Sequence, residues 1–185
     1  MNLSIIIVNW NSGALLRCCL DVLPTACGST LQYEVFVVDN SSEDGSVAEA
    51  HKSPQPFTLL ALDRNVGFAG ANNIALKRAR GDILLLLNPD TEPRPGSLEA
   101  LVEFFSAHHK AGVVGAKLLN PDVTIQRSVR RFPSVGVLAA LFLRLPRVFP
   151  RLPFYRRYEM ASFPYDCEAS VDQVMGAPAA PQKPG

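Results

Sequence analysis

Two segments that are predicted as strands are each followed by a carboxylate. Asp90 follows the unbroken run Ile83–Leu87 after two intervening residues, and Asp39 directly follows the run Tyr33–Val38. An apolar run without polar alternation is typical of a strand buried on both faces in a parallel sheet. Ligands of open α/β sheets bind beyond the carboxyl ends of the strands, where a carboxylate can hold a metal or a phosphate-linked cation. We therefore predict a ligand site at Asp90.

A helix cap is the alternative role for Asp90. The next predicted helix begins near Ser97, and six residues, two of them proline, lie between Asp90 and that helix. A capping residue stands immediately before the first helical residue. The spacing therefore favours the ligand site over the cap.

The segment Asp63–Gly70 contains two glycines and an asparagine ahead of a predicted helix. Glycine lets the backbone approach a ligand closely, and a helix amino terminus offers unpaired amide hydrogens to anionic or polar groups. The sequence contains neither the dinucleotide fingerprint G-x-G-x-x-G nor the phosphate-loop pattern G-x-x-x-x-G-K. The segment predicts a polar ligand without identifying it.

Strand and helix patterns alternate through the first part of the chain. The predicted strands are Leu3–Val8, Tyr33–Val38, Phe57–Leu62 and Ile83–Leu87, with the last in the centre of the sheet. Four helices are predicted. The first is capped by Ser12 and ends at Pro24, the second is a short helix after Ser46, and the others are Ala71–Ala79 and Ser97–His109. This alternation predicts the α/β class, as a three-layer α/β/α sandwich around a mostly parallel, Rossmann-like sheet.

The later residues follow a weaker pattern. Val113–Leu119 is predicted as a further strand, and Thr124–Val129 as a strand that pairs back antiparallel. From Arg130 on, arginines alternate with leucine, aromatic residues and proline, which predicts irregular structure. These arginines could contact phosphate or an anionic membrane surface, or form a solvated surface excursion.

The composition is that of a globular protein with no basic excess. The 185 residues are long enough for one domain with a substantial core, and 48% of them are hydrophobic and 19% charged. A net charge of +1 argues against nucleic-acid binding. The first residues show no signal-peptide pattern, and the nine-residue run Val135–Leu143 is shorter than the roughly 20 residues needed to span a bilayer. We therefore expect a cytoplasmic protein.

Neither the cysteines nor the histidines form a recognisable metal or redox motif. The cysteines stand at 18, 19, 27 and 167, which matches neither a zinc ribbon nor a redox pair. The histidines stand at 51, 108 and 109 on predicted helices, away from the strand ends. We expect reduced thiols and no catalytic histidine.

Four sequence blocks stand out in this order: Ser4–Asn11, Val37–Ser46, Asn65–Asn73 and Leu87–Thr91. Taken together, they resemble the family 2 glycosyltransferases, in particular the rhamnosyltransferase-like branch of bacterial surface polysaccharide synthesis, with fainter similarity in Arg130–Ser134 and Val171–Ala177. Each block is weak alone, but the combination is specific. The resemblance implies a GT-A fold that binds a nucleotide-diphospho-sugar, UDP- or dTDP-linked, at the carboxyl edge of the sheet.

The resemblance also implies donor-binding roles for particular residues. Asp39 matches the carboxylate that hydrogen-bonds the nucleobase. Asn9 and Asn11 would lie in the loop beside Asp39. The base and ribose pocket would be lined by Asn65, Gly67 and Asn72. Asn88-Pro89-Asp90 takes the place of the family's Asp-x-Asp, so that Asp90 is the expected ligand of Mg²⁺ or Mn²⁺.

The expected reaction is an inverting sugar transfer to a glycan or lipid-linked acceptor. Cleavage of the sugar–phosphate bond leaves negative charge on the diphosphate, which a divalent cation stabilises. A general base must also take the proton of the acceptor hydroxyl. The resemblance implies a base in an acidic motif after the Gly176-Ala177 block, but the residues there are Pro178–Gly185, with four prolines or glycines in eight positions. The catalytic base is therefore unassigned.

These matches divide the chain into a nucleotide-sugar-binding domain (1–129), an incomplete acceptor-side portion (130–177) and a proline-rich tail (178–185). With this ending, we expect donor binding but slow transfer, and self-association at an uncovered sheet edge. A location in peripheral contact with the inner membrane face would suit a lipid-linked acceptor. The alternative function is a non-catalytic sugar-nucleotide-binding or assembly module of the same fold. A sugar nucleotidyltransferase is less consistent, because its glycine- and lysine-rich amino-terminal loop is absent.

Overall fold

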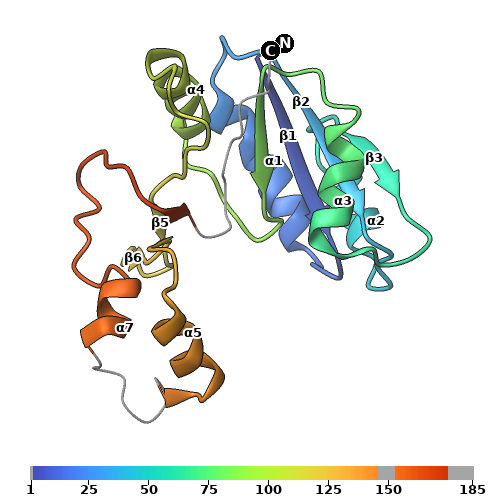
Figure 1. Ribbon diagram of the computed structural model, residues 1–185. Coiled ribbons are helices and arrows are strands. Elements are labelled where there is room, and N and C mark those ends of the chain that lie inside the picture. The colour runs from blue at the N-terminus through green and yellow to red at the C-terminus, as the bar shows by residue number, and fades with distance from the viewer. Residues whose placement is uncertain (1, 146–152, 175–185) are drawn as a thin grey trace. The chain divides into compact units, whose positions relative to one another are not determined.

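The computed structural model describes residues 2–145 and 153–174, which form two compact units (Figure 1). The first unit ends at Ala116, and the second begins at Lys117. The predicted division after Val129 therefore falls inside the second unit. The predicted tail 178–185 and the Gly176-Ala177 pair lie outside the described residues.

A parallel four-stranded sheet organises the first unit, in the order β3-β2-β1-β4. Its strands are β1 (Leu3–Asn9), β2 (Tyr33–Asp39), β3 (Thr58–Ala61) and β4 (Ile83–Leu87). All seven residues of β1 are buried, because β1 has a neighbouring strand on each side and helices over both faces. The four strand predictions are confirmed to within a residue or two.

The helices of this unit cover the sheet in two layers. They are α1 (Leu15–Cys27), α2 (Ser46–Ala50), α3 (Gly67–Leu76) and α4 (Ser97–Ala107). Side chains of α1, α2 and α4 form one apolar core with alternate residues of β1, β2 and β4. Ala71 and Ala75 of α3 pack on the other face, against Ile6 and Val38. The sheet thus lies between two helical layers, as the three-layer prediction required (Figure 1).

The position of β4 differs from the prediction. Within the described residues β4 pairs only with β1 and ends the sheet, so it is not the central strand. Its apolar run reflects helices packed over both of its faces, since Leu85 and Leu87 belong to one core and Leu84 to the other. Burial on both faces does not require a pairing strand on both edges.

Both predicted ends of the first helix are wrong. The Ser12 hydroxyl does not cap α1; it donates to the side-chain oxygen of Asn9, and Ala14 is the capping residue, without a side-chain bond. Pro24 lies inside α1, exposed to solvent, and the helix continues for three residues. Because Ala26 and Cys27 are fully buried, core packing holds the last turn despite the amide hydrogen that proline lacks.

Within residues 117–145 and 153–174, the second unit contains short strands and two helices. Its strands are β5 (Leu118–Leu119), β6 (Ile125–Gln126), β7 (Val129–Arg130) and β8 (Gln173–Val174), which pair antiparallel as β5-β6 and β7-β8. Its helices are α5 (Val135–Phe142) and α7 (Pro153–Tyr158), so the prediction of irregular structure after Arg130 is wrong in part. The strand predicted at Val113–Leu119 is reduced to its last two residues, and the antiparallel return is confirmed only at β6.

Gly81, in the connection between α3 and β4, lies close to the start of β1. Its amide donates to the Ser4 hydroxyl at 2.8 Å, and a Cβ added to Gly81 would lie 2.5 Å from the Ser4 backbone nitrogen. No side chain fits at that distance without displacing the backbone of β1.

We therefore expect Gly81→Ala to lower the melting temperature by several degrees, since a backbone clash in a buried site typically costs about 1–3 kcal/mol. Gly112→Ala is the matched control, because a Cβ there meets nothing within 4 Å. Differential scanning calorimetry measures both. Equal melting temperatures for the two variants would contradict the close approach.

Candidate functional site

The carboxyl ends of β1 and β2 are joined by a buried pair of polar side chains. Asn9 and Asp39 occupy the same register position and are 0% and 7% exposed. The Asn9 side-chain amide donates to Asp39 Oδ1 at 2.8 Å and to Ser46 Oγ, also at 2.8 Å. Two residues predicted to bind the donor are therefore in direct contact, and Ser46 connects them to the start of α2.

The loops after β1 and β2 are bonded to each other. Asn11 has a left-handed φ of 51°. Its side-chain Oδ1 accepts from the backbone amide of Glu43 at 2.8 Å, and its backbone amide donates to Ser42 Oγ at 3.0 Å. The Asp44 carboxylate accepts from the amide of Gly13 at 2.7 Å. Hydrogen bonds from Ser46 hold the pKa of Asp44 below its ordinary value. The predicted residue Asn11 thus shapes the loop, and Asp44 is a structural anion.

Asn40 is a site residue that the sequence analysis did not single out. It is 3% exposed, its side-chain amide donates to Asn65 Oδ1 at 2.8 Å, and its Oδ1 accepts from the amide of Val66 at 2.9 Å. Asn65 Oδ1 also accepts from the amide of Gly67 at 2.8 Å. The signal was present, because Asn40 directly follows Asp39. The Asn65–Gly67 loop is therefore fixed to the end of β2.

Asn72 carries an unpaired polar atom inside the first unit. The residue is 4% exposed, and its side-chain amide donates to the Phe68 carbonyl at 2.9 Å. Its Oδ1 has no hydrogen-bond partner among the described residues. Buried polar atoms are nearly always bonded, so an unpaired acceptor at a predicted ligand position is consistent with a bond that a ligand completes.

Asn88 and Asp90 follow β4 at the same edge of the sheet. Leu87, the last residue of β4, pairs with Ile7, two residues before Asn9. Asp90 is exposed, and the capping residue of α4 is Gly96, so the capping alternative for Asp90 is wrong. The structure therefore places Asp90 beyond a strand end, as predicted.

The surroundings of Asp90 do not form a preassembled metal site. Among residues 2–145 and 153–174, no group of three or more histidine, cysteine or acidic side chains is placed to hold a metal ion. Mg²⁺ is commonly held by one or two carboxylates together with the phosphates of a substrate. A single exposed carboxylate fits a metal that arrives with a diphosphate.

Exposed aromatic side chains stand beside the polar network. Trp10 follows β1 and is 59% exposed, and Phe68 in the first turn of α3 is 53% exposed. Solvent-exposed aromatic faces at a strand-end site can stack on a planar ring. Both residues lay within the matched blocks, but their exposure could not be read from the sequence.

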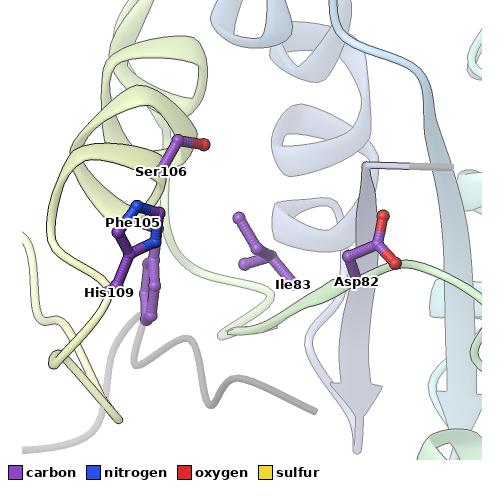
Figure 2. Close-up of a pocket in the computed structure, with 5 residues that line it drawn as sticks. All are labelled: Asp82, Ile83, Phe105, Ser106 and His109. Carbon is purple, nitrogen blue, oxygen red and sulfur yellow. The ribbon is translucent and has the colours of Figure 1, made fainter. Parts of the chain in front are cut away.

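A hollow of about 260 Å³ lies at the opposite edge of the sheet (Figure 2). It is lined by Asp82, Ile83, Phe105, Ser106 and His109. Asp82 precedes β4, whereas the predicted site residues follow strands. The hollow is therefore separate from the candidate site.

Comparison with known proteins assigns the family. The family model described as glycosyl transferase family 2 matches residues 4–169. The chain belongs to this family. Its fold is of the GT-A type, and a similar rhamnosyltransferase supports the resemblance to the rhamnosyltransferase-like branch.

Two curated relatives illustrate the similarity. N-acetylglucosaminyl-diphospho-decaprenol L-rhamnosyltransferase of Mycobacterium tuberculosis is 29% identical over 135 residues, which cover 67% of this chain and 44% of the relative. Succinoglycan biosynthesis protein ExoO of Rhizobium meliloti is 36% identical over 118 residues, covering 61% of this chain and 32% of ExoO. The chain thus spans less than half the length of these relatives.

Two solved structures of similar fold contain bound ligands. The Staphylococcus aureus TarS 1–349 complex with UDP-GlcNAc is 26% identical, with a TM-score of 0.58, over 69% of this chain and 38% of TarS 1–349. The mannosyltransferase PcManGT from Pyrobaculum calidifontis, in complex with GDP-Man and Mn²⁺, is 27% identical, with a TM-score of 0.58, over 65% of this chain and 36% of PcManGT.

The four thiols of this chain should differ sharply in reactivity. Burial, and then the negative charges of Asp90 and Glu92, raise the pKa of Cys19 to about 12, and burial raises that of Cys27 to about 12. Cys18 and Cys167 are exposed. We expect two fast thiols and two protected thiols when the folded protein is titrated with a disulfide reagent at pH 8, and four fast thiols in denaturant.

The same shifts predict the direction of a pH dependence. A pKa raised above the ordinary 9.0 means that the folded state favours the neutral thiol. The contribution of these thiols to the free energy of unfolding should therefore be constant below about pH 9 and should decrease as the pH rises towards 12. Cys19→Ala should flatten this decline in chemical denaturation curves, and an unchanged slope would contradict the assignment.

Proposed function

We propose that this chain is the donor-binding part of a glycosyltransferase that moves a sugar from a nucleotide-diphospho-sugar to a glycan or lipid-linked acceptor, in the synthesis of cell-surface polysaccharide. The observation that carries the proposal is the joining of Asn9 and Asp39 at the carboxyl edge of a parallel sheet, with Asp90 at the same edge. Family membership over residues 4–169 supports it.

Asp39 is the proposed partner of the nucleobase in a UDP- or dTDP-linked donor. Its Oδ1 accepts from Asn9 at 2.8 Å and its Oδ2 accepts from the amide of Ser42 at 3.3 Å. A carboxylate oxygen has two acceptor positions, so one remains on each oxygen for an imide hydrogen of the base. Asn9 therefore serves to orient Asp39, and Asn11 fixes the loop beside it.

The α3 side of the site is proposed to hold the rest of the nucleoside. Asn65 is committed to the loop through its bonds with Asn40 and Gly67, so its role is to position backbone for the ligand. Asn72 Oδ1 is the acceptor that a ribose hydroxyl would satisfy. Trp10 offers a flat apolar face for the base.

Asp90 is the proposed protein ligand of Mg²⁺ or Mn²⁺, with Asn88 beside it. When bound, the cation supplies charge stabilisation to the departing diphosphate. A Mn²⁺ complex of the similar PcManGT supports this proposal. The remaining ligands would be diphosphate oxygens, because no group of three or more histidine, cysteine or acidic side chains is placed to hold a metal ion among the described residues.

The acceptor side is proposed from the relatives alone. The name of the mycobacterial relative refers to a lipid-linked saccharide, which supports a lipid-linked acceptor and peripheral contact of this protein with the inner membrane face. No described helix is both long and apolar enough to cross a membrane. The alternative, a non-catalytic sugar-nucleotide-binding module, predicts donor binding without product when a lipid-linked saccharide is supplied.

We expect UDP or dTDP with Mn²⁺ to raise the melting temperature of the chain. A ligand at one hundred times its Kd stabilises the folded state by about 2.7 kcal/mol, or about 5–10 °C for a domain of this size. Differential scanning fluorimetry with a panel of nucleoside diphosphates, with and without metal, measures the effect. No shift for any of them at millimolar ligand would sink the donor-site proposal.

Variants at the two carboxylates should separate their roles. Asp90→Asn should remove only the metal-dependent part of the shift, because Asp90 is exposed and removing its charge leaves the core intact. Asp39→Ala should weaken nucleotide binding with or without metal. Glu103→Gln, an exposed position on α4, is the control and should behave as wild type. Equal loss of metal dependence in both variants would show that the roles are wrongly assigned.

A further inference from the structure

The helix α5 presents an apolar face that no described residue covers. Its sequence, Val-Gly-Val-Leu-Ala-Ala-Leu-Phe, contains no polar side chain. Only Val137 and Ala140 are buried, whereas Val135, Leu138 and Phe142 are 84%, 53% and 87% exposed. These three stand at positions i, i+3 and i+7, so they form one stripe opposite the buried residues. A helix that is apolar all round normally lies in a core or in lipid.

The length of α5 indicates how it would meet lipid. Eight residues extend about 12 Å, far less than the roughly 30 Å of a bilayer's hydrocarbon core. Such a helix can lie in the interfacial plane with its apolar stripe among the acyl chains. It therefore suits a surface contact.

The segment around α5 has an unusual charge. Residues 130–158 contain seven arginines and neither aspartate nor glutamate nor lysine. Because the whole chain has a net charge of +1 and this segment contributes +7, the other residues together carry −6. A basic and apolar segment in an otherwise acidic chain is the pattern of elements that bind anionic lipid surfaces.

The fold of the second unit holds arginines beside α5. The helices α5 and α7 pack against each other (Figure 1). The amide of Arg131, just before α5, donates to the carbonyl of Tyr158, the last residue of α7, at 3.0 Å. Arg156 and Arg157 of α7 are exposed, as is Arg144, which directly follows the turn at the end of α5. Cationic side chains thus accompany the apolar stripe.

The acidic side chains near α5 have protein partners. Asp172 Oδ2 accepts from the amide of Phe132 at 3.1 Å, and Glu159 is hydrogen-bonded to Tyr155. Neither lies between residues 130 and 158. The charge offered by the segment is therefore positive.

We propose that α5 and its flanking arginines (131, 144, 156 and 157), here called the α5–arginine surface, bind the surface of an anionic phospholipid membrane. The apolar stripe inserts among the acyl chains, and the arginines are attracted to the phosphate headgroups. Charge complementarity selects lipid over the same surface of a second copy of this chain, because that surface would present the same positive charge. The proposal does not depend on the donor site, which lies in the first unit.

Co-sedimentation of the 185-residue chain with lipid vesicles tests the proposal. The vesicles are phosphatidylcholine alone, or phosphatidylcholine and phosphatidylglycerol in equal parts. We expect binding to the anionic vesicles only, weakened by added salt because exposed charges are screened. Binding to neither vesicle, or equal binding to both, would overturn the proposal.

Two double variants and two matched controls assign the binding to the surface. Leu138→Glu with Phe142→Glu should abolish binding, and Arg156→Glu with Arg157→Glu should weaken it by about thirtyfold or more, at roughly fivefold for each arginine lost. The controls, which should bind as wild type, are Val123→Glu with Ile125→Glu in the β5-β6 hairpin and Lys77→Glu with Arg78→Glu at the end of α3, all exposed positions.

Thermal melting and sedimentation velocity complete the test. The nucleotide-induced thermal shift should be the same in every variant, so a failed vesicle experiment and a failed donor site are distinguishable. A dimer that Leu138→Glu with Phe142→Glu converts to monomer, without vesicle binding by wild type, would show that a second copy covers the stripe and would overturn the proposal. If that variant unfolds, the arginine variant and the salt dependence decide.

Discussion

The hydrogen bond between Asn9 and Asp39 is the constraint on which the candidate site depends. It joins two adjacent parallel strands at their ends, in a position that is almost completely buried. A buried carboxylate needs donors, and Asn9 and the amide of Ser42 supply them. Asn9 also donates to Ser42 and Ser46, so this pair holds together the same two loops that Asn11 and Asp44 bond to each other further out.

From that anchor the site extends along one edge of the sheet. Asn40 continues the network to Asn65 and so to the start of α3, while β4 places Asp90 on the other side of β1. Side chains that are already hydrogen-bonded to one another hold these loops in place. The groups left to bind a ligand are one acceptor position on each Asp39 oxygen, Asn72 Oδ1, the exposed aromatic faces and Asp90. That division suits a ligand with one polar ring, a sugar and a charged diphosphate.

Much of the first unit could be predicted from its sequence, because each strand is a mainly apolar segment with a polar residue at its end or within two residues after it. The strand ends, and therefore Asp39 and Asp90, followed directly from this pattern. The errors arose where packing overrides local preference: Pro24 stays helical because the turn after it is buried, and β4 ends the described sheet although it is apolar throughout. Asn40 was missed because its role depends on Asn65, a contact between residues 25 positions apart.

A nuclear magnetic resonance titration would show directly whether a nucleotide binds at the Asn9–Asp39 edge of the sheet. UDP with Mg²⁺ would be added to the isotopically labelled chain, and the amide signals followed residue by residue. We expect the largest shifts at Asn9, Ser42, Gly67 and Asn72, all along the carboxyl edge of the sheet. Shifts confined to Asp82, Ser106 and His109 at the opposite hollow, or no shifts at all, would contradict this expectation.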